Sequence, residues 1–217
     1  MSTFPNSPQL IKGGIVIMDS DSGRVIRVIS LQYNPDTLTR TFQVQSYSEG
    51  GDRSEALRLK SAPVETIKLE AEIDATDQLE FPDRNRNIVQ NGIHGQLAAL
   101  ETLLYPSSED LQNNHDQAGR GVLEIVPMEA PLSLFVWSKH RAVPVRVTDF
   151  SITEEAFDPS LNPIRAKINL GLRVLSVNDL GFKHRGGSLF MSYLKNKEAL
   201  AGSMGSASLN NLGLEGL

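Results

Sequence analysis

The chain has 217 residues, of which 40% are hydrophobic and 22% are charged, a composition typical of a globular protein with a sizeable core. A formal net charge of −5 at pH 7 argues against binding to a nucleic-acid backbone, and the absence of cysteine excludes disulfides and thiolate metal sites. The first residues lack the pattern of a signal peptide and no apolar run approaches the ~20 residues of a membrane span, so we expect a cytoplasmic protein.

The N-terminal half is expected to begin with an extended arm and to continue as strands. Residues 1–12 contain two prolines and form the arm, which either pairs with another element or stays loose. Turn-forming residues at 19–23 predict a hairpin loop between the first two strands. The polar segment 47–55, with two adjacent glycines, is expected to be a loop. The predicted strands are 15–18, 24–33, 37–45 and 57–73.

The strongest strand signal is a strict alternation between residues 67 and 74. Ile67, Leu69, Ala71 and Ile73 alternate with Lys68, Glu70, Glu72 and Asp74. A period of two is typical of a strand with one buried and one solvated face. Because proline cannot donate a ladder hydrogen bond, we expect the strand to be broken near Pro63.

The C-terminal half is expected to contain one helix, further strands and a short second helix. Leucine and isoleucine recur at helical spacing over 93–104, and Pro106 ends that pattern. The polar stretch 107–120 is expected to be a surface loop. A short amphipathic helix is predicted over 188–201, capped by Ser188, and the tail 202–217 has too few large apolar residues to fold by itself. The predicted strands are 122–126, 132–137, 143–150 and 164–177.

These elements predict a mainly β protein. Its strands follow one another in neighbouring pairs, not in βαβ alternation, which favours two packed antiparallel sheets in a sandwich or barrel. One helix flanks the sheets and a short helical extension follows at the C-terminus. We expect an arm at 1–12, a β domain at 13–180 and an extension at 181–217. The polar strand faces would suit a subunit that lines a channel.

The residues that usually carry chemistry are scattered. His94, His115, His140 and His184 have no metal-ligand spacing, so we expect no metal site. The acidic residues 70, 72 and 74 lie along one face of one strand, which offers no opposed pair across a cleft. No phosphate-binding glycine loop and no nucleophile elbow occurs. We therefore expect no catalytic residues, no cofactor and no enzymatic activity.

Three stretches resemble a known family. They are Tyr33-Asn-Pro35 with Leu38, the strand segment 57–77 and the closing strand 164–179. Their order resembles the tube-like domain of contractile injection systems, which are machines derived from phage tails, and the resemblance covers residues 13–179. It implies a structural baseplate-to-tube adaptor or tube initiator. Such a protein forms a hexameric ring between the trimeric spike hub and the inner tube, touches baseplate components, and resides in the cytoplasm within an injection particle that can be released.

The chain also departs from this family. Several members carry a C-terminal LysM domain, whereas only residues 180–217 follow the tube-like domain here, too few for LysM. The sequence therefore does not distinguish the adaptor from a second tube-initiator layer. Two other functions stay open. One is a stand-alone β-sandwich binding module for glycan or peptide, using Trp137 and the acidic face of residues 70–74, and the other is a glycosidase-like or lytic enzyme associated with a tail.

The candidate contact residues lie mostly in the C-terminal extension. A helix of this length is marginal in isolation, so we expect it to dock on an adjacent subunit or a baseplate component. The alternative is a helix folded back on its own domain. Trp137, at the end of an apolar strand, is expected to serve core packing or a subunit contact. The candidates are Leu189, Phe190, Tyr193, Leu194 and Trp137.

Overall fold

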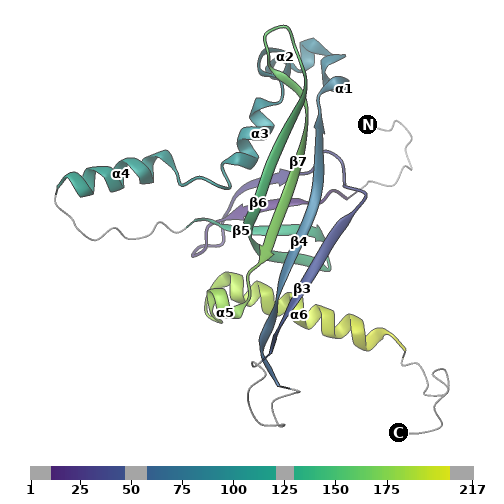
Figure 1. The fold of residues 1–217 in the computed structure, drawn as a ribbon, viewed down its shortest axis with the longest axis vertical. Coiled ribbons are helices and arrows are strands. Elements are labelled where there is room, and N and C mark those ends of the chain that lie inside the picture. The colour runs from purple at the N-terminus through teal and green to yellow at the C-terminus, as the bar shows by residue number, and fades with distance from the viewer. Residues whose placement is uncertain (1–10, 47–57, 121–129, 206–217) are drawn as a thin grey trace.

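Seven strands form one continuous antiparallel sheet in the order β2-β1-β5-β6-β7-β4-β3. The computed structural model describes residues 11–46, 58–120 and 130–205 (Figure 1). The mainly β class is therefore confirmed. The strands are β1 Gly14–Met18, β2 Val25–Ser30, β3 Leu38–Ser46, β4 Leu59–Asp74, β5 Leu132–Ser138, β6 Arg141–Phe157 and β7 Pro163–Val174.

The helices lie between β4 and β5 and after β7. Those after β4 gather near the turn that joins β6 to β7, α4 projects to one side, and α6 crosses the long strands near their other end (Figure 1). The helices are α1 Thr76–Leu79, the 3-10 helix η2 Pro82–Arg84, α2 Arg86–Asn91, α3 His94–Glu101, α4 Ser108–Gly119, α5 Val177–Leu180 and α6 Arg185–Ser203.

The sheet changes direction along β6. The start of β6, up to Val145, pairs with β5, whereas the strand pairs with β7 from Val145 to Phe157. In Figure 1, β3, β4, β7 and the second part of β6 run lengthwise, while β1 and β5 lie across them. Both parts contribute to one core, in which Phe135 lies with Ile168. The prediction of two packed sheets is not confirmed, because the strands belong to a single hydrogen-bonded sheet.

The alternating residues of β4 and β7 form the centre of this core. Their inward side chains stand opposite one another in register, as in the pairs Leu69↔Leu170 and Ala71↔Ile168. Ile67, Ile168 and Leu172 have no exposed surface. Burial of each such side chain contributes about 1.5–3 kcal/mol to stability. The predicted faces of both strands are confirmed.

Two predictions about local structure are wrong. Residues 107–120 are not a loop, because they contain α4, which is capped by Ser107, whose hydroxyl accepts a hydrogen bond from the backbone N–H of Asp110. Strand β4 is not broken at Pro63. This residue precedes Thr66, where pairing with β7 begins, and it lies beside the register shifts between β3 and β4. The missing N–H therefore falls where the ladder is irregular.

Several boundaries also differ from those expected. The helix predicted over 93–104 ends at Glu101, and the C-terminal helix is longer than expected, with His184 as its cap in place of Ser188. Strand β7 ends at Val174, since Ser176 starts α5 with a capping box. The predicted arm up to residue 10, the strand at 122–126 and the tail from 206 lie outside the described residues.

Candidate interaction surfaces

The long strands carry a continuous polar face, which we call the polar face. It is the side of β3, β4, β7 and residues 146–157 of β6 that points away from the core. No large apolar side chain occurs among the described residues of its central part, which excludes Val64 of β4 and Phe157 of β6 at its ends. Five basic and five acidic residues lie there, so their formal charges cancel. They are Lys68, Arg146, Arg165, Lys167 and Arg173, with Glu70, Glu72, Asp74, Asp149 and Glu155.

Cross-strand ion pairs neutralise this face locally. Arg165 Nε lies 2.8 Å from Asp74 Oδ2, and Lys167 Nζ lies 3.4 Å from Glu155 Oε1. Hydrogen bonds from the Thr76 hydroxyl and backbone N–H, together with Arg165, hold the pKa of Asp74 below its ordinary value. Asp74 in turn raises the pKa of Arg165. Exposed pairs of this kind contribute only about 0–1 kcal/mol each, so their main effect is a face without a strong net field.

The four lengthwise strands end in two unpaired edges. Strand β3 is the last of the sheet and pairs only with β4. Strand β6 pairs with β5 only through Arg141–Val145, so residues 146–157 have β7 on one side and no described strand on the other. Unpaired N–H and C=O groups along such edges are templates for pairing with another chain.

A buried carboxylate fastens α6 to β3 and β4. Glu65 is 3% exposed and accepts hydrogen bonds from Arg40 Nε at 2.7 Å, Lys197 Nζ at 3.2 Å and the Tyr193 hydroxyl at 3.2 Å. Tyr193 also accepts a hydrogen bond from Arg40 Nη2 at 2.8 Å. We call these four residues the Glu65 cluster. This cluster was not predicted, although its local signal is Glu65, which is in phase with the buried residue Ile67 and so breaks the apolar pattern.

The C-terminal candidates are placed mainly against their own domain. Phe190 and Tyr193 are 7% and 6% exposed, meet edge to face at 6.5 Å and belong to the main core. Leu189 packs on the smaller cluster around Leu132, and Leu194 is half-buried. Of the two expected positions, the structure thus shows the helix folded back on its own sheet.

Trp137 lies on the core side of β5. Its ring stacks on that of Phe135, with 6.0 Å between centroids, and packs against the main core. A Cβ on Gly13 would approach this ring to 2.7 Å, so the glycine allows close contact. Residues Glu70 and Glu72 instead point away from the core on β4. The structure does not bring Trp137 and the acidic face together in one site.

Metal-binding side chains are not gathered in the described part of the chain. His94, His115 and His140 are exposed and His184 is half-buried. Within residues 11–46, 58–120 and 130–205, no three side chains of the histidine, aspartate or glutamate type are grouped to hold a metal ion. In the same ranges no helix is both long enough and apolar enough to cross a membrane.

No protein family model matches this chain, and no curated protein matches it. The features of the molecule that bear on function are the polar face, the two unpaired edges and the placement of α6.

Proposed function

We propose that this protein is a structural ring subunit of a phage-tail-like contractile injection system. Six copies form a ring that joins the spike hub and baseplate to the inner tube and initiates tube assembly. The observation that carries this proposal is the group of four long strands formed by β3, β4, β7 and residues 146–157 of β6. One side of this group is polar and the other faces the core, and each of its two outer strands has an unpaired edge. Such a sheet can be continued by copies of itself.

Ring closure follows from pairing β3 of one copy with residues 146–157 of β6 in the next. Six copies of four strands give roughly 24 strands, and at about 4.8 Å between strands the closed sheet is about 115 Å around, or roughly 40–50 Å across with the usual strand tilt. A lumen of this width admits a folded or partly folded polypeptide. Because both edges are used, the ring has no exposed strand edge along its lumen.

The polar face suits the lumen of such a ring. Large apolar groups would bind an exposed apolar surface of a passing protein, and a strong net charge would retain a cargo of opposite charge. The central part of the polar face has neither property, since its formal charges cancel and are partly paired. In the ring, the lengthwise strands form an inner layer, and β2, β1 and β5 form an outer one. This arrangement would provide the two layers expected from the sequence.

The partners in this proposal are further copies of the chain, the trimeric spike hub, the inner tube protein and baseplate components. The proposed role is structural and requires neither catalysis nor a cofactor. The geometry applies equally to the adaptor and to a second tube-initiator layer. A glycan-binding module has less support, because Trp137 packs beside Phe135 and is not combined with the acidic strand face.

Cysteine trapping tests the proposed seam, since the chain has no cysteine of its own. Thr41→Cys on β3 would be combined with Ser151→Cys or Thr153→Cys on β6, and the protein would be assembled with the hub and tube proteins of its system. Mild oxidation should give a ladder of covalent species up to six copies on a denaturing gel. Each single-cysteine variant is the control and should stay monomeric or stop at a dimer. If both double-cysteine variants are incorporated into particles but neither gives crosslinked species on the gel, the β3–β6 seam is wrong.

A further inference from the structure

Helix α6 carries one continuous stripe of side chains whose two halves lie in different environments. Phe190, Tyr193, Lys197 and Leu200 recur at spacings of three and four, which places them on one side of the helix, and Met204, the C-cap residue, follows four positions later. The first two are 7% and 6% exposed, whereas Leu200 is 44% and Met204 is 76% exposed. The stripe is thus buried at its start and uncovered at its end.

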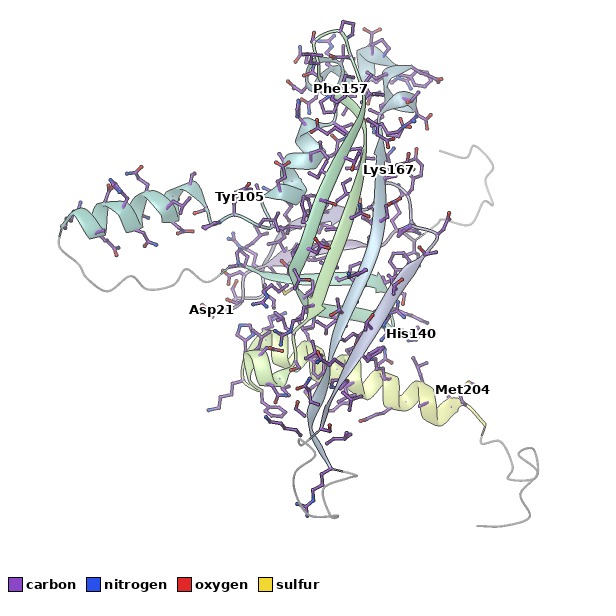
Figure 2. All side chains as sticks on the ribbon, viewed as in Figure 1. Asp21, Tyr105, His140, Phe157, Lys167 and Met204 are labelled. Atoms are coloured by element: carbon purple, nitrogen blue, oxygen red, sulfur yellow. The ribbon has the colours of Figure 1, made fainter. Side chains whose placement is uncertain are left out.

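The Glu65 cluster fixes where the covered part of the stripe ends. Tyr193 and Lys197 are both hydrogen-bonded to Glu65 on β4, and Lys197 Nζ lies 5.2 Å from the ring centroid of Phe42 on β3. Strand β3 is the last strand of the sheet. The remaining turns of α6 therefore extend past the edge of β3, as Figure 1 shows, and Met204 lies near the far end of the helix (Figure 2).

Strand β3 also exposes apolar side chains where α6 leaves the sheet. Phe42, whose ring lies 5.2 Å from Lys197 Nζ, and Val44, two residues further along β3, are both exposed. Together with Leu200 and Met204 they form what we call the overhang. Solitary exposed apolar residues are common, but a run of them along a helix stripe and the adjoining strand edge is typical of an interaction surface.

We propose that the overhang is a strap that binds the next copy of this chain across the seam. This inference rests on the proposed ring. Helix α6 crosses the sheet on its core side, where Phe190 and Tyr193 are buried. When the β6 strand of the next copy extends the sheet past β3, the core-side surface of that copy comes to lie beneath Leu200 and Met204. The occupant is therefore the β5–β6 region of the neighbouring subunit.

This arrangement separates two roles within one helix. Its first half completes the core of its own subunit, and its second half stabilises the contact with the neighbour. Two positions were expected for the C-terminal helix, one docked on a partner and one folded back on its own sheet. In this arrangement both occur, each through different residues of the helix. The Glu65 cluster sets the division because it fixes the helix at the last strand.

Site-specific photo-crosslinking in the assembled full-length protein tests the strap directly. A photo-reactive amino acid is placed at position 200 or 204, and at Ser192, an exposed residue of α6 outside the stripe, as the control. Positions 200 and 204 should give adducts of two copies of 23.8 kDa each, with crosslinked peptides from residues 132–157 of the neighbour. Position 192 should give none. Crosslinks confined to the same chain, at both 200 and 204, would overturn the proposal.

Paired variants distinguish failure of the strap from failure of the ring. Leu200→Asp with Met204→Asp should leave the thermal midpoint of the monomer unchanged but raise the concentration needed for ring assembly at least about tenfold. Ser192→Asp with Ala199→Asp adds the same charge outside the stripe and should assemble normally. If the unmodified chain forms no ring, the proposed function fails. If the ring forms and both double variants assemble equally, or if the first one unfolds the monomer, only the strap is refuted.

Discussion

Replacement of Glu65 by alanine tests how α6 is held on the sheet. The Glu65 side chain is 4% exposed, whereas those of Arg40 and Lys197 are 23% and 37% exposed. Its removal deletes three hydrogen bonds, two of them to cations, and leaves the buried Tyr193 hydroxyl without this acceptor. Hydrogen bonds to charged groups contribute about 1.5–3 kcal/mol each, but the two cations regain water. We therefore expect Glu65→Ala to lower the free energy of unfolding by about 2–4 kcal/mol.

Urea unfolding monitored by circular dichroism measures this loss. The matched control is Glu70→Ala, which removes a carboxylate from the solvated face of the same strand and should change the free energy of unfolding by no more than about 0.5 kcal/mol. A double-mutant cycle with Tyr193→Phe should show a coupling of about 1 kcal/mol or more between the two groups. Equal effects of Glu65→Ala and Glu70→Ala would refute the view that the Glu65 cluster holds α6.

Three further experiments, two with substitutions and one with a truncation, test other parts of the fold. Ile168→Asp places an unpaired charge in the core and should abolish soluble expression or ring incorporation, whereas Lys167→Asp on the polar face should leave the thermal melting curve nearly unchanged. Truncation after Leu180 removes two large core side chains, and the thermal midpoint of the isolated chain should fall by more than about 10 °C. Because the folded-state pKa of Asp74 is lowered, its stabilising effect is present above about pH 4 and is lost as pH falls through the folded-state pKa. Asp74→Asn should therefore lower the unfolding midpoint in denaturant at pH 7, with the difference from the unmodified chain shrinking towards pH 2; a difference that grew in acid would contradict this assignment.

The parts of the fold that follow a local repeat could be predicted from the sequence. Strands β4 and β7 have one buried and one solvated face, so their residues alternate with a period of two, and the alternation gives the buried residues directly. Helix α4 could not be found in this way. It has no apolar stripe facing the core, and its start depends on Ser107 and its acidic first turn. The change in direction of the sheet along β6 could not be predicted either, because it depends on pairing between residues that are distant in the sequence.

The interaction surfaces could be predicted only in part. The polar side of β4 follows from the alternation, but the polar face as a whole requires the order of the strands. Phe190 and Tyr193 were expected to contact a partner because an amphipathic stripe does not specify what covers it. Glu65 was the one local signal that was overlooked, since a carboxylate in phase with Ile67 implies buried partners for its charge.

Cryo-electron microscopy of the assembled injection particle tests the ring most directly. The account predicts six copies of this chain in one layer between the spike hub and the inner tube, about 143 kDa for six copies of 23.8 kDa. The polar face should line the lumen, and β3 of each copy should pair with β6 of the next. A layer of three or twelve copies, or six copies whose polar faces point away from the lumen, would contradict it.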